Sequence, residues 1–198
     1  MTTTAAVELL SGVRARSAIL VEGWSDQAAL ETLARRRAWD LRAEGIAVVP
    51  IGGITNIGKF ADALGPRGLG LRLGGLYDAT DEAYLMRTLG AGMASALTRS
   101  EIERLGFFVC NADLEDELIR ALGTIGVERI LAAEGELNSF RRFQNEPAQR
   151  GRETQAQLRR FLGTRARRKI RYGALLVDAL DLERVPRPLD RALLGLRD

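Results

Sequence analysis

The sequence predicts an α/β protein built on a sheet of about four mainly parallel strands, flanked by helices and followed by a helical C-terminal extension. In the first half of the chain, short apolar runs alternate with stretches of helical periodicity, the pattern of strand–helix–strand units in a parallel sheet. From about Asp113 onward, one helical pattern follows another with glycine breaks between them. We therefore expect an α/β core over residues 17–112 and a helical extension over residues 113–198.

Four apolar runs are the expected strands: "AILVE", "GIAVVPI", "LGLRLGGLYD" and "LGFFVCNAD". Helical periodicity fills the three intervals between them, over residues 25–44, 55–68 and 80–105. Ser25 and Thr55 are the expected N-caps of the first two helices. Because parallel strands joined by right-handed crossovers all point the same way, their carboxyl ends meet at one edge of the sheet.

The composition limits the chemistry that this chain of 198 residues can perform. It contains no histidine and a single cysteine, Cys110. Serine–histidine and cysteine–histidine nucleophiles are therefore excluded, as are zinc sites built from histidine or several thiolates. Carboxylates remain, and they suit hard cations such as Mg²⁺ or Mn²⁺.

Nothing in the sequence points to a membrane. No apolar stretch approaches the roughly 18 residues of a membrane-spanning helix, and the first residues lack the pattern of a secretory signal. A lone cysteine forms no intrachain disulfide and suits a reducing compartment. We therefore expect a cytoplasmic protein without a membrane partner.

Acidic residues recur where the expected strands end. Glu22 closes the first run and Asp78 the third, while Asp113 and Glu115 follow the fourth, and Asp26 lies one turn into the first helix. Each acid alone has a structural explanation, such as a helix cap or a partner of the helix dipole. Several carboxylates at one sheet edge repel one another unless protons or cations compensate them. Two divalent ions would do so and would clamp a phosphodiester during attack by water.

A competing motif is "GITNIGKF", residues 53–60, which has the glycine and lysine spacing of a phosphate-binding loop. Phe60 occupies the position where such a loop requires the serine or threonine that binds Mg²⁺. The simpler interpretation is a helix start with Lys59 exposed.

Positive charge is concentrated in residues 141–171, which contain eleven arginines and lysines against two acids, a local charge of +9. A basic run is usually a solvated helix face. Because aromatic residues are interleaved here, among them Phe143 and Phe161, a surface for nucleic acid is favoured. Only two lysines, Lys59 and Lys169, occur in the chain.

The stretches "VEGWSD" and "GLYDATDE" resemble the Toprim domain, a fold shared by topoisomerases, bacterial primases and nucleases of the overcoming-lysogenisation-defect (OLD) family. The OLD type is favoured by "VVPIGGITNIGKFADALGP", "ADLEDELIRAL" and "RKIRYGALLVDAL", which are similar to successive segments of that family. The resemblance covers roughly residues 17–195. It implies a Toprim-like, Rossmann-like sheet.

The resemblance also implies the roles of individual residues. Glu22, Asp26 and Asp78 would be metal ligands, and Glu115 would be a further acidic ligand. Glu22 and Lys169 would be catalytic, with Lys169 supporting the transition state or orienting the attacking water. Independently of the resemblance, the positive charge of the basic segment predicts DNA contacts through Arg165, Arg167, Arg168 and Arg171.

Two departures from the family pattern matter. The usual Asp-x-Asp signature reads Asp78-Ala79-Thr80, so the second acid is missing. Asp81 or Glu82 could replace it if the turn brings one back, and Thr80 could ligate weakly. OLD nucleases usually carry an ATPase domain before the Toprim domain, so ATP dependence here would come from a separate ATPase partner or be absent.

The sequence-based expectation is a Mg²⁺- or Mn²⁺-dependent endonuclease that hydrolyses DNA with activated water. The alternative is a catalytically degenerate Toprim module that binds nucleic acid or works with a separate ATPase. A topoisomerase would need a nucleophilic tyrosine, and nothing in the sequence points to one of the three tyrosines. A primase would need regions that handle the template and nucleotides, and the chain has no room for them. A homodimer would suit cleavage of both strands, although no interface signal supports one.

Overall fold

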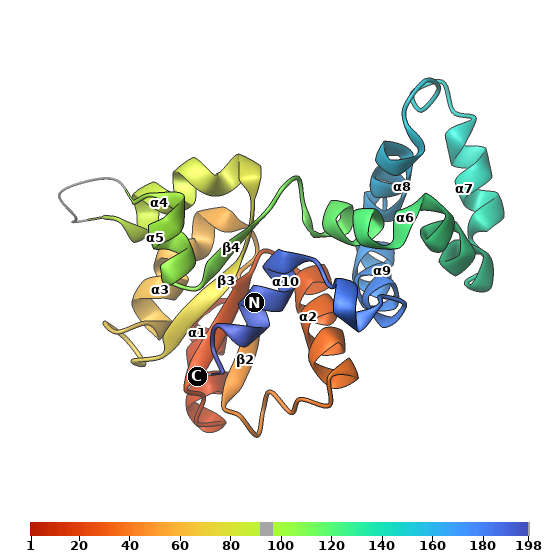
Figure 1. Cartoon of the computed structure of the whole chain (residues 1–198). Coiled ribbons are helices and arrows are strands. Elements are labelled where there is room, and N and C mark those ends of the chain that lie inside the picture. The colour runs from red at the N-terminus through yellow and green to blue at the C-terminus, as the bar shows by residue number, and fades with distance from the viewer. Residues whose placement is uncertain (92–96, 198) are drawn as a thin grey trace.

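Four parallel strands form the centre of the protein in the order β2-β1-β3-β4 (Figure 1). The computed structural model describes residues 1–91 and 97–197. The strands are β1 (Ser17–Val21), β2 (Ile46–Pro50), β3 (Arg72–Asp78) and β4 (Phe107–Cys110). In the register, Ser17 of β1 is paired with Ile46 on one side and with Arg72 on the other. The predicted α/β class with about four parallel strands is confirmed.

Helices cover both faces of the sheet and continue beyond it. The α-helices are α1 (Thr3–Gly12), α2 (Trp24–Arg36), α3 (Ile57–Leu64), α4 (Glu82–Leu89), α5 (Arg99–Arg104), α6 (Leu114–Ala133), α7 (Leu137–Gln144), α8 (Thr154–Gly163), α9 (Ala166–Asp178) and α10 (Arg187–Leu194). Short 3₁₀ turns are η1 (Ile54–Asn56), η2 (Ala79–Asp81) and η3 (Leu182–Arg184).

The central strand β1 separates two hydrophobic cores because its side chains alternate between the faces of the sheet. Ile19 and Val21 pack into one core with α2, α6, α9 and α10. Ala18 and Leu20 pack into the other with α1, α3, α4 and α5. All five β1 residues are buried. Burial on both faces explains why this strand reads as a continuous apolar run.

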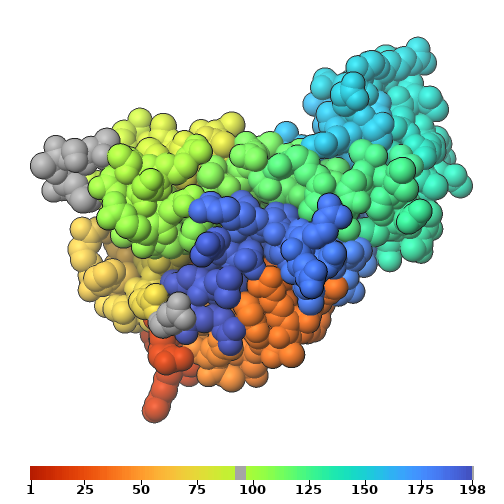
Figure 2. Space-filling view, viewed as in Figure 1, coloured from red at the N-terminus to blue at the C-terminus, as the bar shows by residue number. Residues whose placement is uncertain are grey.

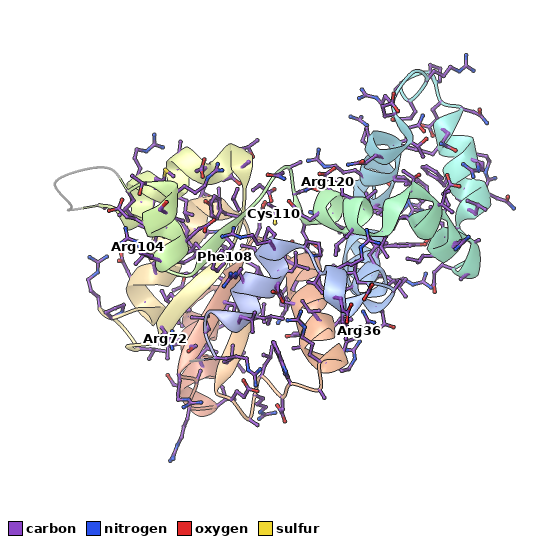
Figure 3. The ribbon with its side chains drawn as sticks, viewed as in Figure 1. Arg36, Arg72, Arg104, Phe108, Cys110 and Arg120 are labelled. Carbon is purple, nitrogen blue, oxygen red and sulfur yellow. The ribbon has the colours of Figure 1, made fainter. Side chains whose placement is uncertain are left out.

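The C-terminal part of the chain does not separate cleanly from the sheet. Helix α10 returns to pack on β3 and β4, and α9 lies along α2 (Figure 1). Arg36 of α2, labelled in Figure 3, donates to the carbonyls of Val177 and Leu180 at the end of α9. Helices α7 and α8 project as a lobe from the rest of the molecule (Figure 2). The boundary expected at residues 112 and 113 therefore marks a change of secondary structure, with α9 and α10 folded back onto the core.

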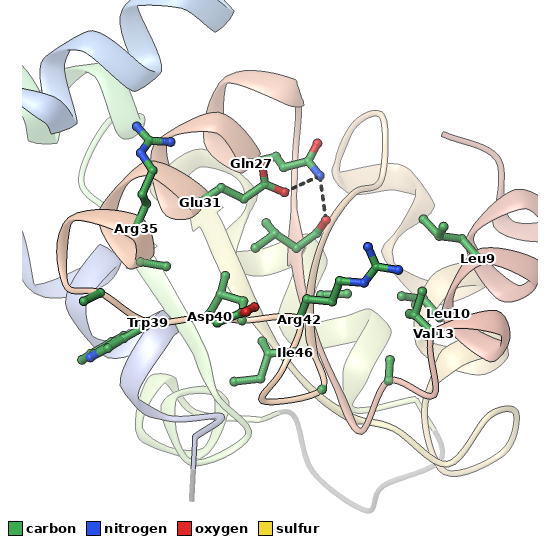
Figure 4. A pocket seen from close by; sticks show the side chains of 17 residues that line it. Leu9, Leu10, Val13, Gln27, Glu31, Arg35, Trp39, Asp40, Arg42 and Ile46 are labelled. Carbon is green, nitrogen blue, oxygen red and sulfur yellow. Dashed lines mark hydrogen bonds between the residues drawn. The ribbon is translucent and has the colours of Figure 1, made fainter.

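The edge strand β2 borders a hollow between α1 and α2 (Figure 4). Gln27 of α2 donates to the carbonyl of Val48 at 3.0 Å, and Ile46 N–H donates to the carbonyl of Leu41 at 2.7 Å. Pro50 has no N–H to offer. These features occupy part of the strand's outer edge, a common protection against edge-to-edge pairing.

Three local expectations differ from the structure. Helix α2 begins earlier than expected, so its N-cap is Gly23 and Ser25 lies within the first turn. Thr55 lies in η1, and Asn56 is the N-cap of α3. The helical pattern expected over residues 80–105 forms α4 and α5, while its residues 92–96 lie outside the described part. Helix α1 was not expected at all.

Candidate metal centre

Glu22 and Asp26 are held at the junction of β1 and α2. Glu22 follows the last residue of β1 and is exposed, whereas Asp26 is buried. The Asp26 carboxylate accepts the Gly23 backbone N–H at 2.7 Å, which caps the helix. The backbone carbonyl of Glu22 accepts the N–H groups of Gly52 and Gly53, so the loop after β2 fixes this junction. The structural explanation of Asp26 as a helix cap is thus correct, and the charge of Glu22 still contributes to raising the pKa of Asp26, after burial.

The end of β3 brings two more carboxylates to Glu22. Oxygen atoms of Glu22, Asp78 and Asp81 all lie within 4.8 Å of one another. The turn η2 follows β3 directly and returns Asp81 toward Asp78. Thr80, the residue in the position of the missing acid, is exposed. Oxygen ligands at this spacing suit one Mg²⁺ or Mn²⁺ ion.

Glu82 has other partners. Both of its carboxylate oxygens accept from Arg99, at 2.5 and 2.7 Å, and Tyr77 donates to it at 3.2 Å. The guanidinium of Arg99 holds the pKa of Glu82 below its ordinary value through these bonds. Glu82 therefore anchors the start of α5 to the start of α4, while Asp81 lies with Glu22 and Asp78.

Glu115 and Lys169 meet at the same edge from α6 and α9. The Lys169 ammonium lies 3.4 Å from a carboxylate oxygen of Glu115. The other oxygen of Glu115, Oε1, is buried and has no hydrogen-bond partner among the described residues. A buried carboxylate oxygen without a partner is costly. It is available to a ligand that fits beside it.

Burial and mutual repulsion raise the pKa values of three of these acids. Burial is the main cause that raises the pKa of Asp78 to about 7, and the charges of Glu22 and Asp113 add to it. Burial likewise raises the pKa of Asp26 to about 6 and that of Glu115 to about 7. Burial alone would lower the pKa of Lys169, but the carboxylates of Glu115 and Asp26 outweigh it and raise this pKa. Lys169 is therefore fully protonated at neutral pH.

Acids that follow β4 have separate roles. Asp113 accepts from Arg159 at 2.6 Å and caps α6 through the Asp116 N–H. Glu117 accepts the Asn111 N–H and pairs with Arg120. Figure 3 labels Cys110 and Arg120 on either side of this crossing from sheet to helices. This network ties α6 and α8 to the end of β4 and so positions Glu115. In the sequence, Asp113 and Glu117 look the same as Glu115, and only the phase of helix α6 distinguishes their side chains.

The four arginines expected to contact DNA fall into two groups. Arg168 pairs with Glu136 at 2.6 Å and stacks on Phe161, with only 12% of its side chain exposed. Arg171 pairs with Glu134. Both are thus engaged within the helical extension. Arg165 and Arg167 are exposed, and no acidic partner is found for either among the described residues.

The phosphate-loop and tyrosine alternatives find no support in the geometry. Phe60 is a core residue, so no hydroxyl stands at the Mg²⁺ position of that motif. Tyr77 donates to Glu82, Tyr84 donates to the carbonyl of Thr55, and Tyr172 is fully buried. Tyr172 is therefore inaccessible, and Tyr77 and Tyr84 are hydrogen-bonded away from the carboxylates of Glu22 and Asp78, so no tyrosine is marked as a nucleophile.

The sheet order, its parallel strands and the acids at their carboxyl ends define a Toprim-like α/β domain. Residues 15–79 match the family model described as "Overcoming lysogenization defect protein-like, TOPRIM domain". These residues thus match a Toprim domain of the OLD-like type, and the resemblance found in the sequence is confirmed.

Solved structures extend the likeness over nearly the whole chain. The C-terminal region of the Xanthomonas campestris pv. campestris OLD protein is 26% identical, with a TM-score of 0.72 and 93% of each chain covered. The C-terminal region of the Burkholderia pseudomallei OLD protein has the same fold at 21% identity, with a TM-score of 0.71, and the match covers 93% of this chain and 98% of that one. No curated protein matches the sequence significantly. Among the described residues, no helix combines the length and apolar character needed to cross a bilayer.

We expect the metal-free protein to become less stable as pH rises from 6 to 8. Asp26, Asp78 and Glu115 have pKa values raised above those of the unfolded chain, so the folded state binds more protons between about pH 4 and 7. The free energy of unfolding should fall by about 1–2 kcal/mol across pH 6 to 8, allowing for solvent screening of the partly exposed Asp78. Because the chain has no histidine, little else titrates there.

Denaturant unfolding in EDTA at several pH values measures this dependence. The Asp78→Asn variant should show a smaller pH slope. Stability that is constant or rises with pH in this window would contradict the raised pKa values that burial, with some charge repulsion, gives these three acids.

Gly173 allows α9 to approach α2 closely. A Cβ atom at Gly173 would lie 2.6 Å from the carbonyl oxygen of Ser25, and Gly173 follows Lys169 by one helical turn. We expect Gly173→Ala to cost about 1–3 kcal/mol by forcing the helices apart. That loss lowers the Tm by about 2–4 °C per kcal/mol in a chain of this size. Gly163→Ala is the matched control, since its Cβ would meet nothing within 4 Å. Equal stability of the two variants would contradict the close contact.

Proposed function

We propose that this chain is a metal-dependent nuclease that hydrolyses phosphodiester bonds of DNA. The observation that carries the proposal is the convergence of Glu22, Asp78 and Asp81 within 4.8 Å, at the sheet edge where Glu115 and Lys169 also meet. The match of residues 15–79 to an OLD-like Toprim domain supports it.

The residues fit a Mg²⁺ or Mn²⁺ cofactor. Glu22, Asp78 and Asp81 would hold the ion through carboxylate oxygens, which are the donors that these cations prefer. Glu115 Oε1 and Asp26 provide further acidic oxygens nearby, with Oε1 lacking a protein partner among the described residues. When bound, the cation supplies positive charge that polarises the phosphate and stabilises charge in the transition state.

Lys169 acts on the phosphate as a hydrogen-bond donor. Its raised pKa keeps it charged at neutral pH, so it is unsuited to remove a proton. Glu115 holds the ammonium at 3.4 Å and limits its movement. A donor held in advance at the site where negative charge develops is an efficient electrostatic catalyst. No tyrosine is marked as a nucleophile, so water is the nucleophile in this proposal.

The substrate backbone is bound by exposed arginines of the segment 141–171. Six of its arginines are exposed, and no acidic partner is found for them in this fully described segment: Arg142, Arg150, Arg152, Arg160, Arg165 and Arg167. Arg165 and Arg167 lie at the start of α9, within one turn of Lys169. A phosphate chain contacting them would lead directly to the carboxylates.

Incubation with supercoiled plasmid tests the proposal. Nicking or linearisation in Mg²⁺ or Mn²⁺, absent in EDTA, is expected. DNA binding without cleavage under either ion would overturn it and favour the alternative, a non-catalytic module that acts with a separate ATPase.

A salt titration tests the DNA path. Replacing Arg165 and Arg167 with glutamine should reduce the slope of log affinity against log salt by about 2, roughly 1 per lost phosphate contact. The double variant Arg14→Gln with Arg42→Gln is the matched control. Both arginines are exposed and precede β1 and β2, so they lie near the amino ends of the strands, away from the carboxylates at the carboxyl ends. Equal slopes for the two double variants would locate the DNA elsewhere.

A further inference from the structure

Trp24 exposes its indole beside the candidate metal centre. It is the first residue of α2 and follows Glu22 by two positions, which limits the distance between their Cα atoms to about 7 Å. Its side chain is 51% exposed, and it is the only aromatic residue among the exposed large hydrophobic residues of the described chain. Helix capping does not require it, because Gly23 and Asp26 cap α2. The fold therefore leaves a large apolar ring in solvent next to the acids.

Trp24 and the basic end of α9 lie on different flanks of α2. The Ser25 carbonyl contacts α9 near Gly173, which marks the α9 side of the helix. Gln27 lies one turn after Trp24 on the same face and donates to Val48 of β2, which marks the other side. Glu22 therefore lies between an aromatic surface on the β2 side and the cationic residues of α9.

We propose that Trp24 stacks on an unpaired base of the substrate, next to the phosphate bound at Glu22. This inference depends on the proposed nuclease function and names its substrate class. An indole face binds any base by stacking, with little sequence preference. A base can offer its face only when it has left the duplex stack. The site accordingly takes single-stranded, frayed or locally opened DNA.

Binding of a fluorescein-labelled single-stranded oligothymidine in EDTA tests the stacking without cleavage. Trp24→Ala should weaken binding about 5- to 100-fold, whereas Trp24→Phe should stay within about threefold of the parent chain. Ile125→Ala is the control, since Ile125 is an exposed residue (68%) on α6. In a Trp39→Phe background, the fluorescence of Trp24 should be quenched by the unlabelled oligonucleotide. Unchanged binding, or equal loss in the Ala and Phe variants, would overturn the inference.

A blunt duplex of the same length separates base stacking from general binding. Trp24→Ala should change duplex affinity by less than twofold, and equal weakening of single strand and duplex would overturn the inference. Cleavage in Mn²⁺ is measured in parallel. If the protein cuts DNA and Trp24→Ala leaves single-strand binding unchanged, the proposed nuclease function stands and the stacking role of Trp24 is wrong. If Trp24→Ala weakens single-strand binding but the protein never cuts DNA, the proposed nuclease function is wrong and the stacking surface stands.

Discussion

Replacing Glu22 with glutamine should reduce DNA cleavage by at least about 1,000-fold while leaving the fold intact. Glu22 is exposed and its carboxylate lies with Asp78 and Asp81, so in the proposed function its charge would serve a bound cation, and the packing of the core does not need it. Removal of a ligand charge lowers metal affinity and the electrostatic stabilisation of the transition state together. Because one of three mutually repelling acids is neutralised, the metal-free variant should be at least as stable as the parent chain.

Two measurements separate these effects. Titration calorimetry with Mn²⁺ should show loss of binding at the carboxylates, and oligonucleotide binding in EDTA should be unchanged or slightly tighter. Glu8→Gln is the matched control, because Glu8 is an exposed acid on α1 outside the carboxylate group. Retained cleavage in Glu22→Gln would remove Glu22 from the centre and with it the main support for the proposed function.

The arrangement of the sheet was predictable from the sequence because buried parallel strands are simple to recognise. β1 and β2 are continuous apolar runs, and an acid follows β1 and ends β3. Since strands in one parallel sheet share a direction, Glu22 and Asp78 had to meet at one edge. The position of Lys169 followed only from the resemblance, since 54 positions separate it from Glu115 and no local pattern connects α6 with α9.

Other parts of the site depend on details that periodicity does not contain. Asp81 and Glu82 are adjacent in the sequence, and the single 3₁₀ turn η2 decides that Asp81 faces Glu22 while Glu82 pairs with Arg99. Arg167 and Arg168 are likewise adjacent, yet helix phase exposes the first and directs the second to Glu136. Turn geometry and helix phase, more than residue type, therefore determine which charged side chains join the carboxylates or remain exposed and which form ion pairs elsewhere.

Replacing Lys169 with alanine should reduce turnover about 100- to 1,000-fold, the range seen when a single electrostatic donor is removed from an active site. Affinity for single-stranded DNA should stay within about threefold, because in the proposed function Arg165, Arg167 and the other exposed arginines would make the phosphate contacts. Stability should fall by about 1–2 kcal/mol. Loss of the ammonium leaves Glu115 buried without its partner, but Glu115 can take up a proton because its pKa is already about 7.

Lys59→Ala is the matched control, since Lys59 is the only other lysine in the chain and is exposed on α3. The double variant Glu115→Gln with Lys169→Ala completes the test. If Glu115 acts by holding Lys169, adding Glu115→Gln to Lys169→Ala should lower turnover no further, and it should restore part of the lost stability. Equal losses of affinity and turnover in Lys169→Ala would make Lys169 one more phosphate contact. The catalytic centre would then consist of the carboxylates alone.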